Sequence, residues 1–91
     1  MILDDLMTII EKRIKLLPSG SYVASVYKEG EDKILQKIGE EAIEVILSAK
    51  KRSKKRLIEE IADLFFMIMI LMSMKGISYK EIFCELEKRQ K

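Results

Sequence analysis

Histidine is absent from the 91-residue sequence, and cysteine and proline each occur once. Without histidine, and with Cys84 alone, the chain has no His-based catalytic triad, His/Cys zinc site, intrachain disulfide or iron–sulfur cluster. One proline and four glycines also supply little turn chemistry for a many-stranded β fold. What remains is a metal site built from oxygen ligands, or no metal site.

Long hydrophobic runs are also missing. The longest, Leu64–Met72, has nine residues and is too short to cross a bilayer. The N-terminus shows no signal-peptide pattern. The composition, 48% hydrophobic and 35% charged, is that of a folded protein rather than a disordered one. We therefore expect one domain over residues 1–91, cytoplasmic, with no membrane partner.

The charge is unevenly distributed. Residues 50–56, KKRSKKR, carry six bases and no acid, whereas residues 31–49 carry five acids and two bases. Without the basic block the net charge of +2 would become −4. Because the rest of the chain is not basic, the sequence does not favour a nucleic-acid partner, and we interpret the block as a solvated turn between helices.

Apolar residues recur at helical spacing in several segments, which predicts an all-α bundle of about four helices. Residues 18–31, which begin with Pro18-Ser19-Gly20, are expected to form a loop. Asp32 is a predicted N-cap, Gly76 a predicted helix end, and Ser78 with Glu81 a predicted capping box. The expected helices cover residues 3–17, 32–49, 54–75 and 78–89.

Acidic residues on the second predicted helix form a stripe bordered by apolar surface on both sides. At about 100° per residue, Glu41 lies at the rim of the core face, and Glu44, three residues later, follows it. Lys37 falls between them in azimuth, so it could meet a bound phosphate or pair with either glutamate. The two carboxylates can point into one volume.

The third predicted helix is apolar nearly all round from Leu57 to Met74, a pattern typical of a buried helix. Glu60 and Asp63 interrupt it, again three residues apart, with no base between Leu57 and Met74. Glu40 and Glu59, taken singly, are better explained as solvated charges. Four carboxylates around one volume would repel strongly, and Mg²⁺ or Mn²⁺ would relieve that repulsion.

Such a site suggests metal-assisted hydrolysis of a phosphoanhydride. Carboxylate-held Mg²⁺ is used most often on phosphate substrates, where it neutralises phosphate oxygens and lowers the pKa of a bound water. Because the chain has no histidine, the general base would be a carboxylate or a metal-bound hydroxide.

The motifs KIGEEAIE (Lys37–Glu44) and EIAD (Glu60–Asp63) resemble the EExxE…ExxD signature of the all-α, MazG-like nucleoside triphosphate pyrophosphohydrolases. Within that superfamily, Ser21–Glu44 is similar to the phosphoribosyl-ATP pyrophosphohydrolase family of histidine biosynthesis. Further matches lie at Arg13, Ser21-Tyr22, Gly30, Asp32-Lys33 and the closing Leu86–Arg89. The similarity covers nearly the whole chain. One departure is FFMIMI, where many relatives carry Tyr or His.

This resemblance implies hydrolysis of phosphoribosyl-ATP to phosphoribosyl-AMP and pyrophosphate with Mg²⁺, in a homodimer or higher homo-oligomer that completes the bundle. The metal ligands and catalytic residues that it implies are Glu41, Glu44, Glu60 and Asp63. It implies Glu40 as a further catalytic acid of the motif, which either lies just outside the metal ligands or acts as a base. Its implied substrate contacts are Lys37, Lys33, Ser21, Tyr22 and Arg13.

Two alternatives remain open. A MazG-like house-cleaning enzyme would use the same carboxylates on free nucleoside triphosphates. A helical oligomerisation or nucleic-acid-binding module would instead use residues 50–56, and its binding would be salt-sensitive and indifferent to Glu41→Gln.

Overall fold

The computed structural model describes residues 1–90 and confirms the predicted all-α class, with no strand in that range. The helices are mostly amphipathic segments, and the first, second and fourth α-helices end at a glycine or at a residue in the left-handed conformation. In chain order they are α1 (Ile2–Leu16), α2 (Tyr22–Glu29), α3 (Glu31–Lys50), α4 (Lys54–Lys75), α5 (Tyr79–Glu87) and a short 3₁₀ turn, η1 (Lys88–Gln90).

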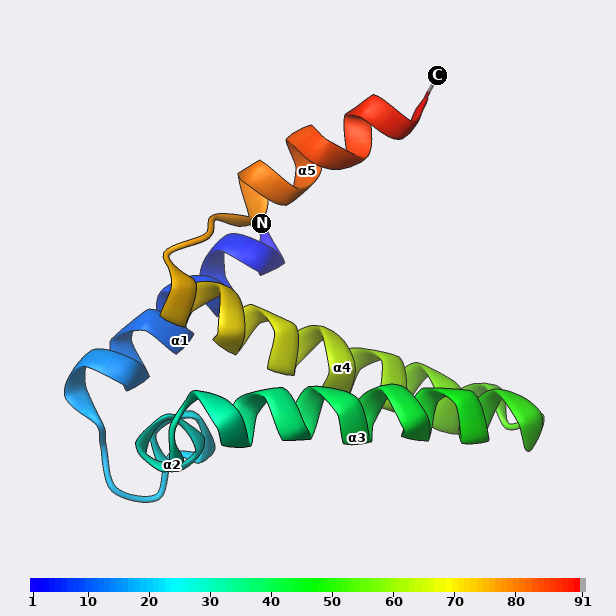
Figure 1. The fold of residues 1–91 in the computed structure, drawn as a ribbon, viewed down its shortest axis with the longest axis horizontal. Coiled ribbons are helices and arrows are strands. Elements are labelled where there is room, and N and C mark those ends of the chain that lie inside the picture. Colours follow the sequence, from blue (N-terminus) through cyan, green and yellow to red (C-terminus); the bar gives the residue numbers. More distant parts are fainter. Residues whose placement is uncertain (91) are drawn as a thin grey trace.

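The two long helices, α3 and α4, lie side by side as an antiparallel hairpin that forms the body of the molecule (Figure 1). Ser53 caps α4 by accepting a hydrogen bond from the Arg56 backbone N–H at 3.2 Å. At the other end of the hairpin, Lys75 Nζ lies 2.8 Å from Glu31 Oε1, which ties the end of α4 to the start of α3. The basic block therefore includes the turn between them, as predicted.

One helix was not predicted from the sequence. The segment expected to be a loop, residues 18–31, contains α2, so residues 1–90 form five α-helices rather than about four. Ser21 caps it by accepting from the Ala24 N–H at 3.2 Å. Tyr, Val and Ser are modest helix formers, and burial of Val23 and Val26 outweighs that weak propensity.

The start of α3 also differs from the prediction. Gly30, at φ 99° and ψ 171°, ends α2 and caps α3, so Asp32 lies inside the first turn and is not the N-cap. There Asp32 and Glu31 interact favourably with the positive end of the helix dipole. Because no side chain caps α3, that charge interaction replaces a capping hydrogen bond.

The core lies where α1 and α2 pack on one end of the α3–α4 hairpin. Ile10, Ile34 and Ile70 are its largest fully buried side chains. The methionines of α4 contribute to this core, since Met67, Met69 and Met72 are buried. No helix within residues 1–90 is both long and apolar enough to span a membrane.

The C-terminal helix α5 extends away from the rest of the molecule (Figure 1). Its predicted capping box is confirmed, because Ser78 and Glu81 make both reciprocal hydrogen bonds. The helix nevertheless buries no residue. The expectation that α4 is buried on all sides holds only on one face, since Ile58 and Phe65 are 58% and 61% exposed.

Candidate metal centre

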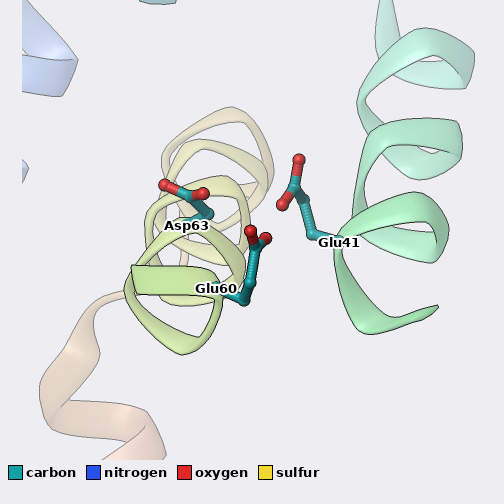
Figure 2. A group of neighbouring side chains, drawn as sticks. All are labelled: Glu41, Glu60 and Asp63. Carbon is teal, nitrogen blue, oxygen red and sulfur yellow. The ribbon is translucent and has the colours of Figure 1, made fainter. Parts of the chain in front are cut away.

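Three carboxylates from the two long helices meet on the inner side of the hairpin. Glu41 extends from α3 toward α4, where Glu60 and Asp63 project from adjacent turns (Figure 2). One oxygen from each residue can be chosen so that all three lie within 4.8 Å of one another. We call Glu41, Glu60 and Asp63 the carboxylate cluster. The structure thus brings together three of the four predicted ligands.

Burial increases across the carboxylate cluster, from an exposed Asp63 through a half-buried Glu41 to Glu60, which is 5% exposed. The buried acid is paired: Arg56 Nη2 lies 3.0 Å from Glu60 Oε1. Arg56 lies one residue before the segment Leu57–Met74, which contains no base. A buried charge without a partner is costly, so this ion pair explains how Glu60 is tolerated without a cation.

Glu41 experiences the crowding most directly. Its partial burial raises the pKa of its carboxyl above the ordinary value of 4.5, and the negative charges of Asp63 and Glu60 raise it further. Lys37 opposes that rise, and Glu44 adds to it. Mutual repulsion within the carboxylate cluster therefore disfavours full ionisation of its three acids. A bound cation would relieve that repulsion.

Glu44, the fourth predicted ligand, is exposed and lies outside the carboxylate cluster, although its charge reaches Glu41. Glu40 is exposed as well and accepts a hydrogen bond from Gln36 Nε2 at 2.9 Å. That bond lowers the pKa of Glu40, and the positive charges of Lys37 and Lys33 lower it further. Lys37 Nζ lies 3.7 Å from Glu40 Oε1, so its ion pair is with Glu40 and not with either neighbour foreseen from the helical wheel.

A solvent-open cavity of about 300 Å³ adjoins the carboxylate cluster. Glu41 and Asp63 line one side, and Tyr22, Phe66 and Met67 line the other. Tyr22 is half exposed, and its hydroxyl donates to Met67 Sδ at 3.6 Å. The cavity confirms that Tyr22 lies near the acids. Phe66 and Met67 belong to the apolar segment FFMIMI and were not predicted to line a cavity.

The remaining predicted substrate contacts are placed as follows. Ser21 has a structural role as the cap of α2. Lys33 lies on the first turns of α3, half-buried, with its charge felt by Glu40. Arg13 is exposed on the last turn of α1, and within residues 1–90 it makes no ion pair.

The donor set fits a hard divalent cation. Carboxylate oxygens are the ligands that Mg²⁺ and Mn²⁺ prefer, and no soft ligand stands among the cluster residues. The carboxylate cluster supplies three donors, which leaves room for water or a phosphate oxygen in a six-coordinate shell. Chemically, such an arrangement can hold a polyphosphate and activate water beside it.

Comparison with known proteins gives a consistent result. The sequence model of the family described as phosphoribosyl-ATP pyrophosphohydrolase matches residues 3–90. The phosphoribosyl-ATP pyrophosphatase of Leptospira biflexa is 53% identical over 81 residues, covering 89% of this chain and 88% of that protein. Those of Metallosphaera sedula and Saccharolobus solfataricus are each 39% identical over 90 residues, covering 99% of this chain and 97% and 96% of theirs.

Proposed function

This chain belongs to the phosphoribosyl-ATP pyrophosphohydrolase family, and from that premise we propose that it hydrolyses phosphoribosyl-ATP to phosphoribosyl-AMP and pyrophosphate, the second step of histidine biosynthesis. In this reaction water cleaves the anhydride bond between the α- and β-phosphates, so that pyrophosphate departs and phosphoribosyl-AMP remains. The observation that carries the proposal is the meeting of Glu41, Glu60 and Asp63 beside a cavity that Glu41 and Asp63 line.

The carboxylate cluster would hold Mg²⁺, with Mn²⁺ as an alternative, and Glu44 would join it as a fourth ligand from the next turn of α3. When bound, the cation would neutralise phosphate oxygens and lower the pKa of a coordinated water. Glu44 is exposed and its charge already reaches Glu41, which supports this assignment. Carboxylate oxygens suit hard divalent cations as a class, so they do not distinguish Mg²⁺ from Mn²⁺.

The chain's own residues must also orient the water and take its proton. Because the sequence contains no histidine, we propose a carboxylate as the residue that accepts the proton. Glu40 stands next to Glu41 and is our candidate for an outer-shell role, holding water or accepting a proton. Its lowered pKa keeps it ionised at neutral pH, ready to accept hydrogen bonds.

The cavity beside the carboxylate cluster is suited to the organic part of the substrate. Tyr22, Phe66 and Met67 present aromatic and thioether surface, which packs well against a flat base or a sugar. Lys37 and Lys33, on the same helix as Glu41, are proposed to meet phosphate groups. Ser21 orients Tyr22 by capping its helix, and Arg13 is assigned to the outer edge of the substrate.

We also propose that the chain works as a homodimer or higher homo-oligomer. A groove of about 230 Å³ between α4 and α5 is lined entirely by apolar and aromatic side chains, among them Phe65, Ile82 and Phe83. Exposed apolar patches of this kind typically mark protein interfaces. Light scattering over a range of concentrations tests this proposal, and Phe65→Asp should shift the mass toward the monomer. A cytoplasmic location stays a prediction from the sequence.

The test is pyrophosphate release from phosphoribosyl-ATP, measured with and without Mg²⁺ and alongside ATP and dUTP. Glu41→Gln should abolish release, whereas Glu59→Gln, which changes an exposed acid next to the cluster residue Glu60, should not. Release from phosphoribosyl-ATP alone, lost with chelator, supports the proposal. Preferential release from ATP or dUTP would move the assignment to a house-cleaning enzyme, and no release by folded protein would favour a binding module.

A further inference from the structure

The ion pair between Arg56 and Glu60 joins the basic block to the carboxylate cluster. The two residues stand one helical turn apart on α4, with Arg56 Nη2 3.0 Å from Glu60 Oε1. Their surroundings differ sharply, because the Glu60 side chain is 6% exposed and that of Arg56 is 59% exposed. Within residues 1–90, no other ion pair reaches a residue of the carboxylate cluster.

We propose that Arg56 is the resident counter-ion of the carboxylate cluster and that it lowers the affinity of the cluster for divalent cations. Without a cation, Arg56 supplies the positive charge that buried Glu60 requires. A bound cation supplies that charge itself and repels the guanidinium. This inference rests on the proposed function, which provides the cation.

The direction of the effect follows from comparing the two states. Loss of Arg56 leaves a buried carboxylate uncompensated in the cation-free protein, which raises the free energy of that state. In the cation-bound protein the same loss costs less, because Glu60 keeps a positive partner and a repulsive interaction disappears. Removing Arg56 therefore strengthens cation binding while it weakens the cation-free fold.

The local sequence gives an independent reason to single out Arg56. The first turn of α4 contains Lys54, Lys55 and Arg56 and no acid. Positive charge at a helix N-terminus opposes the helix dipole. Lys54 and Lys55 are exposed and make no ion pair within the described chain, whereas Arg56 recovers a partner in Glu60. Lys54→Gln thus removes the same charge from the same turn without touching the carboxylate cluster.

The experiment compares wild type, Arg56→Gln, Arg56→Lys and Lys54→Gln in two assays that need no substrate. Thermal melting in EDTA reports the cation-free fold, and the electron paramagnetic resonance signal of free Mn²⁺ gives its dissociation constant. Arg56→Gln should melt at a lower temperature in EDTA and bind Mn²⁺ about fivefold more tightly. Lys54→Gln should leave both values near wild type.

Arg56→Lys keeps the charge and guards against a Gln variant that does not fold without a cation. It should bind Mn²⁺ within about twofold of wild type, because the repulsion of the cation is retained. Unchanged or weaker Mn²⁺ binding by Arg56→Gln would overturn the counter-ion role, and weaker binding would show instead that Arg56 orients Glu60 as a ligand. Absence of Mn²⁺ binding in the wild type would overturn the proposed metal site as well, so the two failures are distinguishable.

Discussion

Glu41→Gln is expected to stabilise the cation-free protein while it abolishes the response to divalent cations and the catalytic activity. Glu41 lies within 4.8 Å of Glu60 and Asp63 in the carboxylate cluster, and the charges of both raise its pKa. Glutamine has nearly the same shape but carries no charge. The substitution therefore removes repulsion without opening a cavity.

The magnitude follows from the spacing. Two unit charges about 4 Å apart repel by about 1 kcal/mol in water and about 4 kcal/mol at an effective dielectric constant of about 20. Because Glu41 is half-buried beside an open cavity, and because its attraction to Lys37 is lost as well, we take a net stabilisation of about 1 kcal/mol. For a domain of this size, that corresponds to a rise in melting temperature of about 4–8 °C.

The assay is thermal melting at neutral pH in EDTA and then in Mg²⁺. In EDTA, wild type should melt at a lower temperature than Glu41→Gln. Addition of Mg²⁺ should raise the melting temperature of wild type but change that of Glu41→Gln little. Glu59→Gln controls for loss of one exposed charge on the neighbouring helix and should behave as wild type. A Glu41→Gln protein that melts at or below the wild-type temperature in EDTA would refute the reasoning from repulsion.

The same repulsion predicts a dependence on pH. The folded-state pKa of Glu41 is raised above 4.5, so the ionised carboxylate destabilises the fold at neutral pH. That cost is relieved as the pH falls through the raised pKa toward 4.5. The difference in melting temperature between Glu41→Gln and wild type, measured in EDTA, should therefore be largest near pH 7. It should shrink as the pH falls toward 4.5. A difference that grows on acidification would contradict this sign.

Five further substitutions, at four positions, test the fold and the cavity. Gly30→Ala should destabilise the fold by about 1–3 kcal/mol, because φ at that residue is 99°. Gly39 lies inside a helix with no neighbouring atom within 4 Å of an added Cβ, so Gly39→Ala should stabilise the fold by about 0.5–1 kcal/mol. Urea unfolding measures both changes. Tyr22→Ala should raise KM for phosphoribosyl-ATP about tenfold with a smaller effect on kcat, and Tyr22→Phe should stay within about threefold of wild type, since Tyr22 lines the cavity and its ring would contact the substrate. Equal losses in both variants would assign the effect to the hydroxyl. Ser78→Ala should cost about 1 kcal/mol through loss of the capping box, and a melting temperature unchanged from wild type would show that α5 does not contribute to cooperative unfolding.

Much of the architecture could be predicted because its signals are local. The bounds of α4 follow from Ser53 before it and Gly76 after it, and the structure has the helix at Lys54–Lys75 as expected. The i, i+3 acid spacing predicted that acids of two helices point into one volume, and the structure brings Glu41, Glu60 and Asp63 together. Sequence periodicity suffices when a helix is long and its caps are explicit.

The rest depended on tertiary packing. The helix α2 has weak propensity, and burial of Val23 and Val26 against other helices decides its conformation. The cavity wall at Phe66 and Met67 required knowing which face of α4 meets α2. The pairing of Lys37 with Glu40 reflects a choice between neighbouring rotamers that no helical wheel resolves. Arg56 stood in a segment interpreted as a solvated turn, although the i, i+4 spacing to Glu60 could have revealed it.

The hairpin also makes the carboxylate cluster a matter of register. Glu41 lies on α3, and Glu60 and Asp63 lie on α4, so their meeting depends on the position of α4 along the axis of α3. A slip of one helical turn moves a residue about 5.4 Å along the axis. That exceeds the 4.8 Å within which all three chosen oxygens lie. The short turn after α3 and the Lys75–Glu31 ion pair at the opposite end set this alignment. An insertion or deletion in the turn between α3 and α4 would therefore separate the acids of the carboxylate cluster, although every one of them would remain in the sequence.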